Sequence, residues 1–490
     1  MSVSSDAESR SNLSRLAVQS TFWSYGSFVS GKLLVFISTV ILARLLVPEQ
    51  FGLMGFCLIA IQYLDVLNGF GVDSAVISRR DREEETANAA FVVAIATGVS
   101  LFVIAWFIAP VIAAFFNEAQ VVELFRVLAI VIPLSALGSV PMALIQRGLR
   151  FKAKFIPDIG RSIAKGSVSI VLAWQGFGVW SLVIGQIAGE LVVVIAVWVI
   201  ARWRPTRRFD REVFRQILRY GANLIGVGIT GALIINIDYL LVGKVLGAAA
   251  LGYYTLAYRI PELAIRNTNF VIGRVAFPFL SRAQADADHL RSMYGSMLRY
   301  VALFTFPAGL GLALIAPLFI RTFYTETWEP AIVVMQLIAL ALAVSSIGHL
   351  PGVVYKAINR PEVLNKLSLA KLIVTTLVLG VAIRWDVEGV AAGQLLLATM
   401  FVTVDVVVVA RLLSFAPSAT FRAISPALAA SLVMAAGVLA LQVTVGPAGV
   451  SGLVLTIVSA VVIYAGAVSI VSRETVIRAR TVVRSALARA

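Results

Sequence analysis

The chain has 490 residues, of which 59% are hydrophobic and only 14% charged, and its mean hydropathy is +0.92. Soluble globular proteins are about 45–50% apolar and about 25% charged, and disordered chains combine low hydrophobicity with high net charge, so both classes are excluded. The apolar residues suffice for about fourteen membrane-spanning helices of about 20 residues each. The composition therefore predicts an all-α polytopic membrane protein.

Apolar segments long enough to span a membrane recur along the whole chain. Residues 1–17 are polar, and the long apolar run after them lacks a small-residue cleavage site, which predicts an uncleaved first helix rather than a signal peptide. The fourteen predicted spans are 18–43, 50–72, 88–115, 121–146, 156–175, 177–201, 213–236, 238–277 (with a kinked or re-entrant part), 293–320, 331–355, 363–384, 387–412, 423–443 and 449–471.

Charges between these spans orient them. Twenty-eight Lys and Arg fall on one side and five on the other, namely Arg44, Arg126, Lys244, Arg321 and Arg384. Because Lys and Arg are retained on the cytoplasmic side, both termini are predicted to be cytoplasmic. Most of the net charge of +15 then serves topology and contact with anionic membrane lipids, and no nucleic-acid partner is expected.

Two short motifs recur about 200 residues apart and predict an internal duplication. Residues 44–52 are matched by 244–252, with a cation, two aliphatic residues and a closing glycine in register, and residues 135–141 are matched by 345–351. With six spans per repeat the halves have the same orientation, so they are parallel repeats related by an axis along the membrane normal. Two six-helix halves are typical of a transporter that rocks about a site between them.

The predicted organisation follows from this duplication. Residues 1–17 form a cytoplasmic segment, 18–205 an N-terminal bundle of helices 1–6, and 206–415 a C-terminal bundle of helices 7–12. Residues 416–472 form helices 13 and 14, an appended pair that faces lipid, and residues 473–490 form a basic cytoplasmic tail.

Ionisable side chains at membrane depth are costly and usually face a cavity or a partner. Arg259, Glu262 and Arg266 are spaced to share one helical face, and Asp158, Arg161 and Lys165 repeat that pattern in the fifth span. Two cationic faces, one in each half, predict a positive central cavity. The candidate ligands for an anionic group, in particular a phosphate, are Arg259, Arg266, Arg161, Lys165 and Lys32. Phosphate oxygens match the paired donors of arginine.

A structural alternative remains for these cations, namely neutralisation of Arg266 by Glu262 and of Arg161 by Asp158 for helix packing alone. Asp65 and Glu262 are candidates for ion coupling, since a buried carboxylate near cations can change protonation with its solvation. For Asp65 and Asp405, two alternatives remain: each could carry a coupling proton or simply pair with a cation. Arg274, Lys371 and Glu190 are predicted to lie near helix ends, where a long side chain can reach the interface.

Four prolines lie within predicted helical runs, where each removes one backbone hydrogen bond and permits a kink. Pro141, Pro261, Pro307 and Pro351 are therefore hinge candidates, although static kinks would explain each of them equally well.

Catalytic and metal-binding signatures are not found in the sequence. One cysteine and two histidines do not predict a disulfide or a metal site, and no nucleotide-binding loop or nucleophile elbow occurs. The sequence predicts a secondary transporter, not an enzyme, with no cofactor. A membrane glycosyltransferase or polymerase is disfavoured because the outward loops are too short for a domain that places a catalytic carboxylate.

Several motifs resemble those of Wzx-like flippases of the colanic-acid-exporter type, within the multidrug/oligosaccharidyl-lipid/polysaccharide exporter superfamily. The matching segments are residues 43–52, 176–182, 236–244, 251–254, 257–259 and 277–282. The resemblance implies about fourteen helices in two bundles around a V-shaped central cavity. It also implies transfer of an undecaprenyl-diphosphate-linked oligosaccharide to the outer leaflet of a bacterial cytoplasmic (inner) membrane. This transfer would be driven by an ion gradient and would serve lipopolysaccharide, exopolysaccharide or capsule synthesis. Polysaccharide polymerase or export machinery is the implied partner.

Two other transporters on the same fold remain as alternatives. A flippase for a lipid-linked peptidoglycan precursor would require similar chemistry. An ion-coupled multidrug antiporter is less favoured, because a cavity for cationic drugs would be acidic, whereas cations dominate the predicted cavity.

Overall fold

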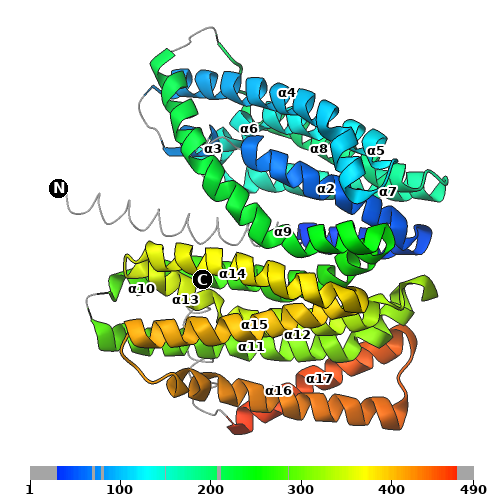
Figure 1. Cartoon of the computed structure of the whole chain (residues 1–490), viewed down its shortest axis with the longest axis vertical. Helices are drawn as coiled ribbons and strands as arrows, with labels where there is room; N and C mark the ends of the chain where they lie inside the picture. The colour runs from blue at the N-terminus through cyan, green and yellow to red at the C-terminus, as the bar shows by residue number, and fades with distance from the viewer. Residues whose placement is uncertain are drawn as a thin grey trace. The chain divides into compact units, whose positions relative to one another are not determined.

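The computed structural model describes residues 30–68, 72–78, 82–148, 150–206, 211–284 and 286–471, and these residues are almost entirely helical (Figure 1). The predicted segments 1–17 and 473–490 lie outside them. The chain divides into two compact units, residues 1–252 and 253–490. The predicted boundaries of the helical bundles stay predictions.

The first unit is built from a helix whose described part covers residues 30–45 and from the helices that follow it. Those helices are α2 (Pro48–Asn68), α3 (Val72–Ser78), α4 (Glu83–Phe116), α5 (Val121–Leu128), α6 (Val131–Arg147), α7 (Phe151–Trp174), α8 (Val179–Ala201) and most of α9 (Arg211–Pro261). Near the end of α9, Gly247 has a φ of 85° and breaks the helix, a backbone conformation that glycine adopts without steric cost.

The second unit begins with the last turns of α9 and continues to residue 471. Its elements are the π-helix η1 (Glu262–Arg266), α10 (Asn267–Arg282), α11 (Ala287–Phe323), η2 (Glu326–Trp328), α12 (Ala331–Ile347), α13 (His349–Ala357), α14 (Pro361–Ala382), η3 (Ile383–Trp385), α15 (Asp386–Leu412), α16 (Ser418–Val445) and α17 (Gly449–Val471).

Ten helices within the described ranges are long and apolar enough to cross a membrane. Several of these ten stretches join two helices, for example residues 361–412, which contain α14 and α15. Helix α7 falls outside the ten because several charged residues interrupt its apolar sequence. A helix suits this environment because it satisfies its own backbone hydrogen bonds where no water is present. The predicted all-α, multi-pass membrane fold is confirmed, and the count of fourteen spans stays a prediction.

Helices α16 and α17 pack on α11 of the second unit (Figure 1). Buried Met434 and Val438 of α16 lie in a cluster with Leu310 and Leu314 of α11, and the Tyr464 hydroxyl of α17 donates a hydrogen bond to the Leu303 carbonyl at 2.7 Å. Their other faces expose large apolar side chains, as expected of a pair of helices that faces lipid.

The two copies of the first repeated motif contact each other within the first unit. A methyl group added to Gly52 would overlap the backbone of Ala248, and one added to Gly252 would overlap the backbone of Pro48. Gly52 and Gly252 occupy equivalent positions of the motif, 200 residues apart, and so do Pro48 and Ala248. The contact of Gly52 with Ala248 is therefore equivalent to the contact of Gly252 with Pro48. This reciprocal contact, between residues 48–52 and 248–252, lies within the first unit, and the predicted duplication stays a prediction.

The four candidate hinge prolines lie in helices or at their ends. Pro141 is inside α6, Pro307 inside α11 and Pro351 inside α13, while Pro261 ends α9 directly before η1. Their role in bending during transport stays a prediction.

Candidate functional site

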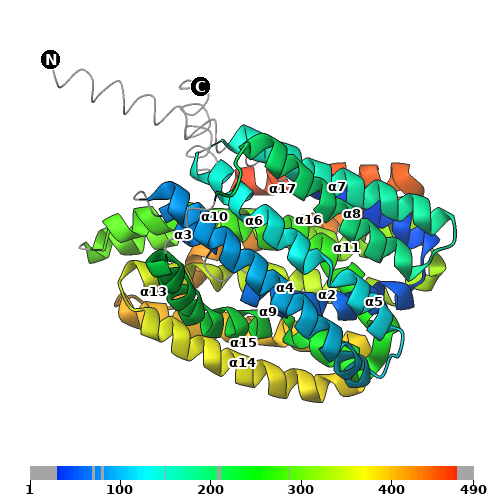
Figure 2. The same ribbon diagram turned by 90° about the horizontal axis from the view of Figure 1, so that it is seen from above.

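Two glycines on α8 allow this helix to approach α7 closely (Figure 2). A methyl group on Gly189 would lie 3.1 Å from the carbonyl oxygen of Arg161, and one on Gly185 would overlap the hydroxyl of Ser169. Small residues four positions apart permit such an approach between membrane helices. Side chains from the middle of α7 consequently reach those of α8.

The closest charged contact between these helices is an ion pair between Arg161 and Glu190. The distance from Arg161 Nη2 to Glu190 Oε2 is 3.1 Å, and the side chains are 46% and 7% exposed. A buried carboxylate needs such a partner, because an uncompensated charge in a low-dielectric interior is strongly destabilising. The prediction that Glu190 lies near a helix end is wrong, since it lies near the middle of α8 (Val179–Ala201).

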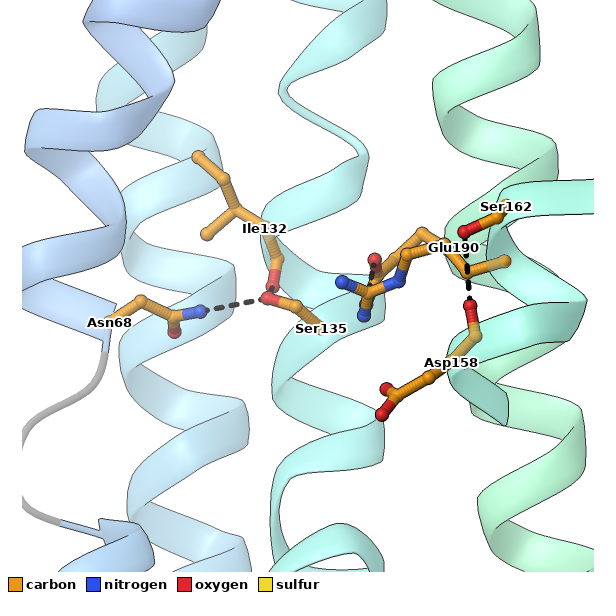
Figure 3. A network of polar contacts seen from close by, with 7 residues as sticks. Asn68, Ile132, Ser135, Asp158, Ser162 and Glu190 are labelled. Carbon is orange, nitrogen blue, oxygen red and sulfur yellow. Dashed lines mark hydrogen bonds and ion pairs between the residues drawn. The ribbon is translucent and has the colours of Figure 1, made fainter. Parts of the chain in front are cut away.

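A cavity of about 490 Å³ lies inside the first unit beside this ion pair. Its polar lining comes from α2, α6, α7 and α8 and consists of Gln62, Asp65, Asn68, Ser135, Ser139, Arg161, Gln186 and Glu190. Asn68 Nδ2 donates to Ser135 Oγ at 3.0 Å, and Ser135 Oγ donates to the Ile132 carbonyl at 2.9 Å (Figure 3). The amides and hydroxyls of this lining were missed in the sequence, because uncharged polar residues are common in helices that only pack.

Asp65 is the second carboxylate of the cavity. Its side chain is exposed, and it forms no hydrogen bond or ion pair with any residue that the structure describes. The charged groups that act on it electrostatically are Glu190 and Arg161. The cavity thus combines two carboxylates with one guanidinium group.

Lys32 and Lys165 belong to the same unit, on two helices that cross. A methyl group on Gly166 of α7 would overlap the Ser38 hydroxyl, and one on Gly31 would lie 3.5 Å from the Ser162 hydroxyl. The structure therefore brings Lys32, Arg161 and Lys165 onto one packed pair of helices, although only Arg161 lines the cavity. Asp158, the alternative partner considered for Arg161, does not line the cavity. Its backbone carbonyl accepts a hydrogen bond from Ser162 Oγ at 3.2 Å (Figure 3).

The remaining candidate cations lie in the second unit. Arg259 is half-buried in the last turns of α9, and none of the carboxylates that the structure describes forms an ion pair with it. The positive charge of Arg259 interacts electrostatically with the Tyr324 side chain. Arg266, by contrast, is paired with Glu262 at 3.2 Å, and both side chains are more than one-third exposed.

The prediction that Arg259, Glu262 and Arg266 share one α-helical face is wrong in its register. Residues 262–266 form a π-helix directly after Pro261, and the wider turn of a π-helix displaces Arg266 around the axis relative to Arg259. Proline explains the change, because it cannot donate the backbone hydrogen bond of a regular α-helix.

A second ion pair lies within the second unit, between Lys371 of α14 and Asp405 of α15. The distance from Lys371 Nζ to Asp405 Oδ2 is 2.6 Å, and the side chains are 29% and 4% exposed. The Tyr355 hydroxyl also donates to the Asp405 carbonyl oxygen at 3.3 Å. Lys371 lies near the middle of α14 (Pro361–Ala382), so its predicted position near a helix end is wrong as well.

Metal chemistry has no candidate site in the part of the chain that the structure describes, where no group of three or more His, Cys, Asp or Glu residues could hold a metal ion. The arrangement instead offers charged and polar side chains at membrane depth, which can bind a charged ligand in transit.

Comparison with known proteins places this architecture in context. Residues 41–333 match the model of a family described as polysaccharide biosynthesis protein. The chain is 28% identical over 280 residues to the teichuronic acid biosynthesis protein TuaB of Bacillus subtilis strain 168, which covers 57% of this chain and 58% of TuaB. It is 26% identical over 364 residues to the lipopolysaccharide biosynthesis protein WzxC of Escherichia coli strain K12, which covers 74% of each chain.

Among solved structures, the fold resembles the lipid II flippase MurJ in an inward closed conformation. The TM-score is 0.74 at 14% sequence identity, over 94% of this chain and 100% of MurJ. At this identity the likeness shows a shared fold.

Proposed function

Because this chain belongs to the polysaccharide biosynthesis protein family, we propose that it moves an undecaprenyl-diphosphate-linked oligosaccharide across the cytoplasmic membrane by alternating access, for synthesis of a cell-surface polysaccharide. The names of its relatives TuaB and WzxC refer to teichuronic acid and lipopolysaccharide biosynthesis. They favour this substrate over a peptidoglycan precursor or a cationic drug.

The environment of Arg259 is the observation that supports the proposal. Arg259 is held half-buried in a segment apolar enough to span a membrane, and no carboxylate among the described residues pairs with it. A cation at this depth is costly unless a partner compensates it. A diphosphate would supply that partner, because its oxygens accept the paired hydrogen bonds of a guanidinium group.

The other candidate cations are proposed to contact the diphosphate to different degrees, each within its own unit. Arg266 keeps an exposed side chain despite its bond to Glu262, and Lys32 and Lys165 supply cations from the first unit. Arg161 is already neutralised by Glu190, so its direct contribution to diphosphate binding is smaller.

The remaining features of the transport cycle are part of the same proposal. An ion gradient would drive transport through Asp65 or Glu262, both termini would be cytoplasmic, and a polysaccharide polymerase or export assembly would receive the product. No catalytic step is required of the chain.

The test is lipid analysis of cells that express Arg259 variants in a deletion background. We expect Arg259→Ala to cause accumulation of the lipid-linked oligosaccharide on the cytoplasmic leaflet, with a loss of export of about tenfold or more, because hydrogen bonds to charged groups contribute about 1.5–3 kcal/mol each. Arg259→Lys keeps the charge but loses the paired donors, so it should retain partial export.

Arg321→Ala is the matched control, because this exposed arginine pairs with Glu329 at the end of α11. It should export normally. Wild-type export by Arg259→Ala at normal membrane abundance would refute the assignment of Arg259 to the diphosphate.

A further inference from the structure

The cavity of the first unit contains an imbalance of charge. Arg161 neutralises one carboxylate, Glu190, through the ion pair at 3.1 Å. Asp65 lines the same cavity, and Glu190 and Arg161 are the charged groups that face it. With all three groups ionised, the charged residues of the lining carry one net negative charge. Ionisable groups within membrane-spanning helices usually face a partner or a bound ion.

Two residues of the same lining each have an uncharged side-chain oxygen without a hydrogen-bond donor among the described residues. Asn68 Oδ1 on α2 and Gln186 Oε1 on α8 are buried, and neither accepts a hydrogen bond from any described residue. Buried acceptors of this kind are rare in folded proteins and call for a partner. Both oxygens, like the carboxylates, attract positive charge or a proton donor.

The hydroxyl groups of the lining also lack a free hydrogen to donate to the cavity. Ser135 and Ser139 each donate their hydroxyl hydrogen to a backbone carbonyl, at 2.9 Å in both cases, so neither hydroxyl hydrogen is available to the cavity. The Ser135 oxygen already accepts from Asn68 Nδ2, and the Ser139 oxygen remains as an acceptor. The one cationic group of the lining, the Arg161 guanidinium, is committed to Glu190.

From this geometry we infer that the cavity binds one monovalent cation, a proton or a sodium ion, at Asp65, with Arg161 as a built-in counter-charge that limits the site to a single positive charge. The assignment of that cation as the driving ion of transport rests on the proposed function, whereas its binding does not. The second unit offers a contrast, because Lys371 and Asp405 form a neutral pair there.

The experiment measures cation binding by the full-length protein purified in detergent, without any transport assay. Equilibrium binding of ²²Na⁺ against a choline background tests for sodium. Difference titration of wild type against Asp65→Asn tests for a proton, since an ordinary aspartate releases its proton near pH 3.9 and a site that carries a proton in use must titrate nearer to neutrality.

We expect either saturable binding of about one Na⁺ per chain, or one additional group that titrates above about pH 5 and is absent from Asp65→Asn. Asp65→Asn should weaken sodium binding about tenfold or more, because a charged ligand is lost. Glu49→Gln is the matched control, because it removes an exposed carboxylate from the same helix, outside the cavity lining, and should bind like wild type.

Two further variants test whether binding depends on the net charge of Asp65, Glu190 and Arg161. They remain informative if Asp65→Asn fails to fold. Glu190→Gln leaves Arg161 and Asp65 to neutralise each other, so cation binding should fall about tenfold or more. The double variant Arg161→Gln with Glu190→Gln restores one net negative charge and should recover binding to within a few-fold of wild type.

The outcomes separate this inference from the proposed function. Sodium binding or a near-neutral proton at Asp65 supports the site even if no oligosaccharide is transported. The absence of both in wild type, unchanged binding in Asp65→Asn, or failure of the double variant to exceed Glu190→Gln would overturn it, and transport of the lipid-linked substrate would still be open to its own test.

Discussion

Lys371 and Asp405 satisfy each other at membrane depth, whereas Arg161 must serve Glu190 with Asp65 nearby. The physical requirement is the same in both units, because a charge in a low-dielectric environment must be matched. A neutral pair fulfils the requirement permanently and binds helices together. A set with unequal numbers of positive and negative groups fulfils the requirement only when a further ion binds.

The neutral pair gives a prediction about stability. Asp405→Leu should destabilise the protein by about 3–5 kcal/mol, because it leaves the Lys371 ammonium without its partner in the interior. Adding Lys371→Met should recover most of that loss, since an apolar pair of similar volume is tolerated in place of a buried ion pair. The midpoint of thermal unfolding in detergent measures both effects.

The exposed pair between Arg321 and Glu329 is the control for this series. Glu329→Gln should cost only about 0–1 kcal/mol, because solvent screens exposed ion pairs. If the double variant Asp405→Leu with Lys371→Met were no more stable than Asp405→Leu alone, this would contradict the interpretation that the two charges neutralise each other.

At this scale the sequence identifies charged residues but not their partners. Arg161 was recognised as a membrane cation, yet its partner Glu190 lies on the next helix, 29 residues away. Which residues of two helices meet depends on their crossing, and the crossing depends on Gly185 and Gly189 in three dimensions. The pattern of residues in the sequence alone does not determine which residues of the two helices come into contact.

Helices are the scale at which prediction succeeded best. Long apolar stretches predicted spans close to those observed, such as 449–471 for α17 (Gly449–Val471) and 387–412 for α15 (Asp386–Leu412). The irregular features, namely the break at Gly247 and the π-helix after Pro261, were anticipated only as a kinked eighth segment. Hydropathy reports the length of an apolar run, but the local hydrogen bonding inside it depends on packing.

The contact between residues 48–52 and 248–252 gives a prediction about helix packing. Gly52→Ala should lower stability by about 1–3 kcal/mol, the usual cost of overpacking a tight contact, because the added methyl group would overlap the Ala248 backbone. Gly252→Ala should have a similar effect through Pro48. Thermal unfolding of the purified variants measures both.

Gly295→Ala in α11 is the control, since a methyl group there meets nothing within 4 Å. It should stabilise the protein by about 0.5–1 kcal/mol, because glycine is unfavourable inside a helix. Equal behaviour of Gly52→Ala and Gly295→Ala would show that the contact is looser than the structure indicates.

For the whole molecule, the balance of Lys and Arg between the predicted loops leads to a prediction of orientation. The split of 28 to five predicts that both ends of the chain are cytoplasmic. Reporter fusions at Ser2 and Ala490 should therefore both report a cytoplasmic location. One end reporting an outside location would require an odd number of spans and would refute the predicted count of fourteen.

The reciprocity of Gly52 and Gly252 has a consequence for the origin of the chain. Self-complementary surfaces of this kind are the mark of a two-fold homodimer, in which one residue meets a second and the second copy returns the same contact. A polypeptide of half this length would already carry both surfaces and could pair with an identical copy. If the chain arose by fusion of such a pair, each copy would have been free to change alone, and an unequal charge set in one half could then coexist with a balanced ion pair in the other.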